Sequence, residues 1–258
     1  MMSERVYGQN VQVQSLGEAA VYLGGERVVW SKSTDELFWY LHAHEAGCYR
    51  HQLLADLWQL EENPASANRF RVTLHRLRSS LGRSAVLEDH GRYHLHPDFL
   101  AASDTAQLLG ALQAQCTSPQ EQEEALRRAA AAGQGEYLPH ISADWVQPFR
   151  AFYRAAQLRA YLALSELHCQ RCECALSAST LAAALERDPL LDEQYHQRLM
   201  VCLGDLEGKY AATEYYRRYS HYLRSEVGDT PLPETVALAK NIKDGQVTCP
   251  RRALLRVP

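Results

Sequence analysis

The chain has 258 residues, of which 46% are hydrophobic and 22% are charged. This composition is typical of globular proteins and excludes a largely disordered chain, while the length favours two domains. No run approaches the roughly 18 apolar residues that span a bilayer, and the opening MMSERVYGQN lacks the apolar core of a secretion signal. We therefore expect a cytoplasmic protein with no membrane partner.

The net charge of −4 argues against a protein that coats nucleic acid indiscriminately, but the charge is unevenly distributed. Residues 68–96 contain six arginines and two acids, a local charge of +4 that leaves −8 for the remainder. A protein that binds one DNA site needs only such a local basic surface.

The first β-prone runs are Val11–Ser15, Ala19–Leu23 and Arg27–Trp30, which glycine-bearing turns separate. They predict a small antiparallel meander. Three helices should follow: one that begins in the capping residues Ser33–Glu36 and ends before Gly47, one at His51–Trp58, and one that Ser66 caps and that reaches about Leu81.

A terminal hairpin is expected from Ala85–Leu87 and Tyr93–Leu95, joined by a turn that contains Gly91. The order of strands, three helices and hairpin predicts an α+β N-terminal winged helix-turn-helix over residues 9–98. Arg92 would lie at the tip of the hairpin.

The third predicted helix has two different faces at 100° per residue. Phe70, Leu74, Leu77 and Leu81 share one face, and the opposite face carries Asn68, Val72, His75, Arg76 and Ser79, flanked by Arg69 and Arg71. A solvated amphipathic helix has the same pattern. The hairpin beside it favours DNA, because arginine and asparagine read base edges in the major groove.

From Ser103 onward the periodicity is helical, so a domain boundary is expected near Pro97–Ser103. EGKYAATEYY echoes RCECALSAST at an offset of 36 residues, which is typical of stacked helix pairs. The large and small positions of a tetratricopeptide-type hairpin are filled by Tyr161, Leu164, Ser165, Cys174, Ser177, Leu181 and Ala184, whereas Thr213 and Ser220 replace the usual alanines in the next repeat. This predicts an all-α tetratricopeptide-like helical repeat domain over 103–245 and a tail over 246–258.

Cys169, Cys172 and Cys174 invite a metal or redox interpretation because closely spaced thiolates bind zinc. Packing is favoured, since Cys172 takes the place of the turn glycine of such a repeat and no second CxxC pair is present. The seven cysteines are an odd number spread over a fairly large chain, which is unlike the disulfide framework of a secreted protein. We therefore expect reduced thiols. The tyrosines Tyr210, Tyr215, Tyr216, Tyr219 and Tyr222 suit core packing or a partner surface, and this choice stays open. The sequence contains no catalytic motif, so we expect neither an enzyme nor a cofactor.

Val11–Leu95 resembles the winged helix of OmpR-type response regulators, and the whole chain is similar to the Streptomyces antibiotic regulatory protein family. The segments that carry this resemblance are VQVQSLG, HRLRSSLG, HGRYHL, GEYLPHISADW and LRSEVGDTPLPET, the last two being similar to the bacterial transcriptional activation domain. Val11 lies close to the start of the sequence and no GxxxxGK loop occurs, so we expect neither a phosphoacceptor domain nor an ATPase module.

The resemblance implies an activator that binds direct repeats in promoter DNA, engages RNA polymerase and acts as paired copies, with the possibility of a homodimer. It implies contact roles for Asn68, Arg71, Thr73, His75, Arg76, Arg78 and Arg92, to which the face analysis adds Arg69 and Val72. Asn68 and Arg71 stand where response regulators often have arginine and aspartate, so the target sequence does not carry over. Two alternatives remain: a tetratricopeptide adaptor with a protein-binding winged helix, and a metal or redox sensor that uses the three cysteines.

Overall fold

The structure, a computed structural model, describes residues 11–132, 134–246 and 249. The expected tail over 246–258 therefore lies almost wholly outside the described residues, as do residues 9 and 10 of the expected winged helix. Contacts divide the chain into two units. The N-terminal unit comprises the described residues through Thr117 together with Arg128–Gln157, and the helical unit comprises Ser118–Arg127 together with the described residues from Leu158 onward.

The N-terminal unit begins with an antiparallel sheet of order β1-β2-β3, in which Val13 of β1 pairs with Val21 of β2. Its strands are β1 (Val11–Gln14), β2 (Ala20–Leu23) and β3 (Glu26–Arg27). The third strand is shorter than the expected Arg27–Trp30 and begins one residue earlier. Val29 is 83% exposed, so the apolar character of this run does not reflect a continued buried strand.

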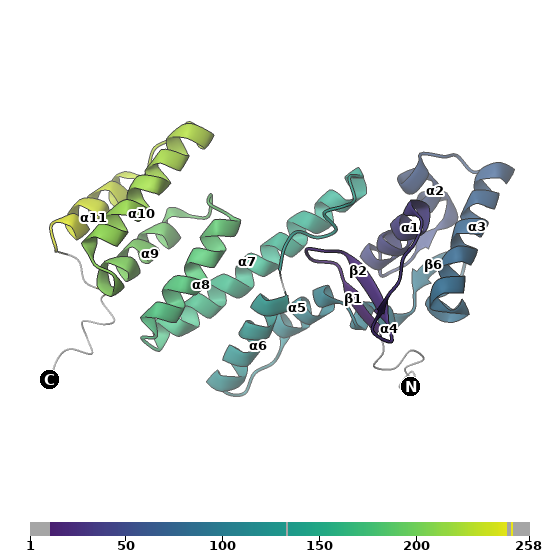
Figure 1. Ribbon diagram of the computed structural model, residues 1–258, viewed down its shortest axis with the longest axis horizontal. Helices are drawn as coiled ribbons and strands as arrows, with labels where there is room; N and C mark the ends of the chain where they lie inside the picture. The colour runs from purple at the N-terminus through teal and green to yellow at the C-terminus, as the bar shows by residue number, and fades with distance from the viewer. Residues whose placement is uncertain (1–10, 133, 247–248, 250–258) are drawn as a thin grey trace. The chain divides into compact units, whose positions relative to one another are not determined.

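A winged helix follows, as the sequence predicted (Figure 1). It consists of α1 (Lys32–Ala43), β4 (Cys48–Tyr49), α2 (Arg50–Trp58), α3 (Pro64–Leu81), a short 3-10 turn η2 (Arg83–Ala85) and the hairpin β5 (Val86–Asp89) and β6 (Arg92–Leu95). The three strands form a sheet of order β4-β6-β5. Ser31, two residues before the expected Ser33, is the N-cap of α1.

Helix α1 is buried on all sides, since every residue from Leu37 to His42 is buried. A helix that is apolar around its whole circumference must be covered on both faces. One face contacts α2 and α3. The other lies against aromatic residues that follow much later in the chain: Tyr40 meets Trp145 at a ring distance of 5.1 Å, and His42 meets Tyr137 at 6.3 Å.

The helices α4 (Pro97–Ala101) and α5 (Asp104–Gln113) pack against β1. The carboxylate of Asp104 accepts hydrogen bonds from the backbone N–H groups of Ser15, at 2.9 Å, and Leu16, at 2.8 Å. Because buried N–H groups need such partners, the first sheet depends on residues beyond the expected boundary near Pro97–Ser103.

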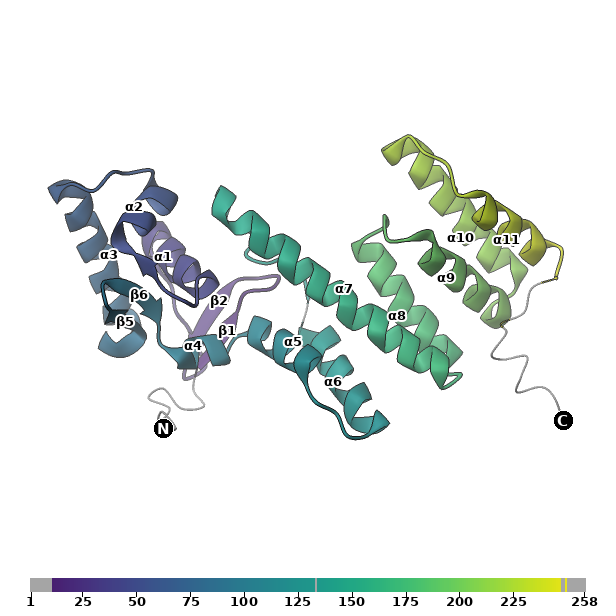
Figure 2. The same cartoon turned by 180° about the vertical axis from the view of Figure 1, so that it is seen from behind.

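The helical unit stacks antiparallel helices, each on its neighbour (Figure 2). The remaining elements of the chain are α6 (Pro119–Ala132), η3 (Asp144–Val146), α7 (Gln147–Gln170), α8 (Cys174–Arg187), α9 (Glu193–Leu206), α10 (Lys209–Tyr222), η4 (Leu223–Val227) and α11 (Pro233–Lys243), and the division between the units falls within α6 and α7.

The predicted repeat is present in the geometry of its turns and of its closest helix contact. Cys172 has φ of 59° in the turn before α8, and Gly208, 36 residues later, has φ of 93° before α10. Ser165 and Ser177 are fully buried, and each hydroxyl donates to the other residue's carbonyl at 2.9 Å. Small residues at these positions let the backbones of α7 and α8 approach closely.

Candidate nucleic-acid interface

The third helix starts earlier than the sequence suggested. Asn63 is the N-cap, with its side-chain oxygen accepting from the N–H groups of Ala65 and Ser66, and Pro64 is the first helical residue. Ser66 closes the capping box by accepting from the Asn63 N–H at 2.9 Å. The expectation that Ser66 caps the helix was therefore wrong, because proline at the first position begins a helix rather than breaking it.

The apolar face of α3 anchors the helix in the winged-helix core. Phe70, Leu74, Leu77 and Leu81 are all buried. Phe70 meets Tyr93 of the wing strand β6 edge to face at 4.9 Å. The helix therefore cannot rotate without disrupting the core, and its opposite face has a fixed orientation.

That opposite face is exposed as predicted. Its exposed members are Asn68, Arg69, Arg71, Val72, His75 and Arg76, with Ser79 further along. Val72 is 42% exposed, a large apolar side chain among polar neighbours. The guanidinium of Arg69 lies 4.6 Å from the ring centre of Trp58, at the end of α2, so this cation is held in place by a neighbouring helix.

Two of the expected contact residues point elsewhere. Thr73 is buried, and its hydroxyl donates to the Arg69 carbonyl at 2.9 Å. Arg78 is half-buried, and its guanidinium donates to the Val86 carbonyl from Nε at 3.2 Å and from Nη2 at 2.8 Å. Thr73 thus completes the helix, and Arg78 ties the end of α3 to the first wing strand.

The wing is a tight hairpin in which His90 and Gly91 both have positive φ, 47° and 78°, as a two-residue loop of type I′ requires. Arg92 follows this turn and is exposed, with its guanidinium 4.8 Å from the ring centre of Tyr49 on the adjoining strand β4. A hydrogen bond with Tyr49 raises the pKa of Arg92, which keeps the cation charged.

Sequence reasoning missed three residues of this surface. Trp58 and Tyr49 support Arg69 and Arg92, and Arg83 is exposed in the turn between α3 and the wing. Arg83 was already included in the local charge of +4, which is the signal that could have identified it. Nothing in the periodicity of α3 points to the two aromatic supports, because they lie on other elements.

The three clustered cysteines lie at the end of α7, in the turn and at the start of α8, and all three are half-buried thiols that form no disulfide with another described residue. Among the described residues, the group of three potential metal ligands whose atoms lie within 4.8 Å of one another is Glu123, His168 and Glu173. Glu123 forms ion pairs with Arg127 and Arg171, and His168 is hydrogen bonded to Glu173 at 2.5 Å. This group is an ion-pair network whose ligand atoms already have partners.

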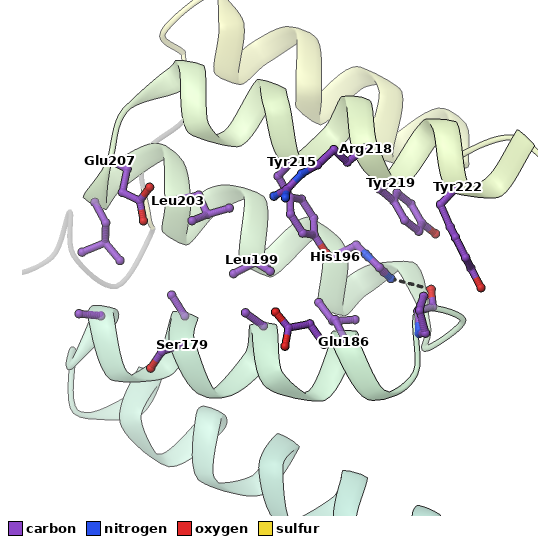
Figure 3. Close-up of a pocket in the computed structure, with 16 residues that line it drawn as sticks. Ser179, Glu186, His196, Leu199, Leu203, Glu207, Tyr215, Arg218, Tyr219 and Tyr222 are labelled. Carbon is purple, nitrogen blue, oxygen red and sulfur yellow. Dashed lines mark hydrogen bonds between the residues drawn. The ribbon is translucent and has the colours of Figure 1, made fainter. Parts of the chain in front are cut away.

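The helical unit contains a groove of about 690 Å³ with α8 and α10 as walls and α9 as floor (Figure 3). His196 is its central residue: the ring stacks on Tyr219 at 3.8 Å and is hydrogen bonded to the Tyr215 hydroxyl at 2.7 Å and the Pro189 carbonyl at 3.1 Å. Burial lowers the pKa of His196, so the ring stays neutral. Tyr215 and Tyr219 therefore serve packing, whereas Tyr210 is 82% exposed.

Comparisons with known proteins agree with this architecture. Residues 98–243 match the family described as "Bacterial transcriptional activator domain". The structure of Mycobacterium tuberculosis EmbR in complex with a low affinity phosphopeptide superposes with a TM-score of 0.69 at 18% identity, covering 95% of this chain and 68% of that one. A search of curated proteins gave no match. Among the described residues, no helix combines the length and apolarity that crossing a membrane requires.

Proposed function

This chain belongs to the bacterial transcriptional activator domain family, and on that premise we propose that it is a sequence-specific DNA-binding activator of transcription. The observation that carries the proposal is the outer face of α3, which is rich in arginine, exposed and rigidly oriented. A helix of this kind beside a basic hairpin is the arrangement by which winged helices read the major groove.

The contacts divide into two kinds, because base contacts specify a sequence while phosphate contacts only position the protein. Asn68, Arg71 and Val72 lie in the N-terminal half of α3 and His75 lies just past its middle. These four residues form the base-reading set, with Val72 suited to a thymine methyl group. Arg76, Arg83 and Arg92 surround this set and form the phosphate-contacting set. Thr73 and Arg78 are left out, because their polar groups already have protein partners.

The helical unit completes the activator in this proposal. It engages RNA polymerase, while paired copies of the winged helix occupy direct repeats in promoter DNA. The support for this step is the family to which residues 98–243 belong, together with the apolar clusters that hold α8, α9, α10 and α11 to one another.

The test starts with selection of a preferred site from fragmented genomic DNA by the full chain. Fluorescence anisotropy titrations at several salt concentrations then compare this site with a scrambled one. Replacing Arg71 by alanine should weaken binding to the preferred site by about 1 to 3 kcal/mol and leave binding to the scrambled site almost unchanged. Arg76→Ala should weaken both and lower the slope of log affinity against log salt by about one.

The matched control is Arg159→Ala, which removes an exposed arginine from α7 and should bind as the wild type does. If Arg71→Ala and Arg76→Ala also bind every DNA as the wild type does, α3 does not read DNA. The outer face would then serve a protein partner, and the chain would be an adaptor.

A further inference from the structure

A second hollow lies in the helical unit, on the other side of α10, between this helix and α11. Its volume is about 730 Å³, within the range of about 300 to 1,000 Å³ that is usual for small-molecule sites. The residues that line it are Thr213, Glu214, Tyr216, Arg217, Arg218, Ser220 and His221 of α10, Arg224 of η4, and Val236, Ala239, Lys240 and Lys243 of α11. We call this hollow the α10–α11 groove.

Positive charge dominates the rim of the groove. The lining contains one carboxylate, that of Glu214, which pairs with Arg217 at 2.6 Å. It contains five cations: Arg217, Arg218, Arg224, Lys240 and Lys243. Arg218, Arg224, Lys240 and Lys243 are exposed and have no carboxylate within 4.0 Å among the described residues. The groove therefore holds four uncompensated cations in a chain whose net charge is −4.

The floor of the groove contains a polar group without a partner. Ser220 is 6% exposed, and its hydroxyl is buried with no hydrogen-bond partner in the described part of the chain. One repeat earlier, the equivalent position holds Ala184, which packs without a hydroxyl. A buried hydroxyl without a partner destabilises a fold, so a packing role alone does not account for serine here.

The walls between rim and floor are largely apolar. Ala239 is buried, Val236 is 46% exposed, and Tyr216 is half-buried with its ring packed beside the Ala212 and Ile242 cluster. Residues 213–221 span about 12 Å along α10 at 1.5 Å per residue, and Arg224 follows in η4. The groove thus offers an apolar surface for a ring system and a row of cations for a chain of phosphates.

We propose that the α10–α11 groove binds a small ligand that carries several phosphates, of the nucleoside polyphosphate type. The arginines and lysines would hold the phosphate oxygens, and the ring system would lie against Tyr216 and Val236, with the Ser220 hydroxyl donating to a ligand atom on the floor. A DNA duplex contacts protruding side chains and would leave the concave floor empty. A small ligand fills it.

The test is isothermal titration of the full chain in magnesium-free buffer with three probes: adenosine triphosphate, inorganic tripolyphosphate and adenosine. Saturable 1:1 binding of adenosine triphosphate supports the proposal. Tighter binding of adenosine triphosphate than of tripolyphosphate assigns a role to the apolar walls, and equal binding identifies free polyphosphate as the ligand source. Adenosine should bind far more weakly than either.

Two pairs of variants locate the site. Arg224→Gln with Lys240→Gln should raise the Kd for adenosine triphosphate about tenfold or more, because each removes a charged hydrogen-bond donor. The control, Lys209→Gln with Arg159→Gln, removes the same charge from exposed positions outside the groove and should bind like the wild type. Equal weakening in both pairs would mean nonspecific attraction and would overturn the proposal.

Ser220→Ala distinguishes a ligand contact from a packing role. The variant should unfold at the same or a higher denaturant concentration than the wild type, because it removes an unpartnered buried hydroxyl. Its affinity for adenosine triphosphate should nevertheless be several-fold weaker. Absence of saturable binding by both phosphate probes would sink the proposal. The proposal would also fail if Arg224→Gln with Lys240→Gln bound both phosphate probes normally but lost binding to an acidic peptide that the wild type binds. The occupant of the groove would then be a protein segment.

Discussion

The N-terminal unit and the helical unit obtain their cores in different ways. In the N-terminal unit, α1 and its C-cap His44 are covered by Tyr137, Trp145 and Phe149, about a hundred residues further along the chain. In the helical unit, α8, α9, α10 and α11 each pack on the helix before or after them. Long-range packing makes one unit depend on distant segments, whereas nearest-neighbour packing spreads stability along a series of repeats.

This difference explains why the limits of a family and the limits of a packed unit do not coincide. The family match starts at residue 98, yet Asp104 packs against the first sheet and Tyr137 packs against α1 of the winged helix. The first segments of the activator domain therefore form part of the support of α1. We infer that α3, the helix proposed to read DNA, and the family domain are physically coupled through α1.

Replacing Tyr137 by alanine should destabilise the N-terminal unit more than any other single change considered for it. Tyr137 is 1% exposed and covers His42, so the change should lower the unfolding free energy of the N-terminal unit by about 3 to 5 kcal/mol. Tyr137→Phe keeps the ring and loses only the hydroxyl near His42, and it should cost about 1 kcal/mol.

Denaturant unfolding of both variants, monitored with a DNA-binding assay, gives the measurement. Tyr219→Ala in the helical unit is the matched control and should leave the stability of the winged helix unchanged. Wild-type stability of the winged helix in Tyr137→Ala would show that residues 128–157 do not support it.

Acid should lower the stability of the N-terminal unit more than that of the helical unit. His42 is buried on α1, and desolvation lowers its pKa from 6.5 to about 4. The unfolded chain binds a proton there that the folded chain excludes, so stability is full above pH 6.5 and falls as the pH drops toward 4. The loss at the lower limit is about 3 kcal/mol for this one group.

Thermal unfolding at pH 7, 5.5 and 4.5 measures this loss, and His42→Gln should flatten the profile between pH 6.5 and about 4. The pKa of His196 in the helical unit is also lowered by burial, but a hydrogen bond with the Pro189 carbonyl opposes that effect. The N-terminal unit should therefore melt first in acid. An unchanged profile in His42→Gln would assign the acid sensitivity to other groups.

Much of α3 could be predicted from the sequence, because its environment repeats every 3.6 residues. The same spacing places Thr73 about 60° from Phe70, so its burial could have been predicted. Thr73 was assigned a contact role only because of the family resemblance. The partner of Arg78 could not be predicted, since periodicity gives a direction and not the position of the Val86 carbonyl. The consecutive apolar residues 37–41 fit the observed full coverage of α1, but nothing in them indicates which distant segment covers it.

Arg78 and Arg76 lie on the same helix, but one is bonded to the wing and the other is exposed. Arg78→Ala leaves the buried Val86 carbonyl without its side-chain donor, so we expect a loss of about 1 to 2 kcal/mol of stability. Because this hydrogen bond ties α3 to the wing, and not because Arg78 contacts DNA, the variant should also bind all DNA more weakly. Arg76→Ala should change stability by no more than about 0.5 kcal/mol while it weakens DNA binding, because Arg76 is exposed. Chemical denaturation beside anisotropy titrations separates the two effects, and equal stability of the two variants would contradict the structural role of Arg78.

The smallest expected effect is in the turn of the helical repeat. Cys172 has φ of 59°, a conformation that glycine adopts without strain, and it is only half-buried. Cys172→Gly should therefore stabilise the helical unit by up to about 1 kcal/mol, although the greater freedom of glycine in the unfolded chain offsets part of the gain. Leu138→Gly provides the contrast: its φ is 45°, but its side chain is fully buried in the N-terminal unit, so the lost packing should outweigh the relieved strain.

Differential scanning calorimetry can resolve both shifts, and DNA titration of Cys172→Gly under reducing and oxidising conditions adds a functional measurement. A variant that is less stable than the wild type, or that loses a redox dependence of DNA binding, would mean that the thiol is retained for its chemistry and not for its place in the turn.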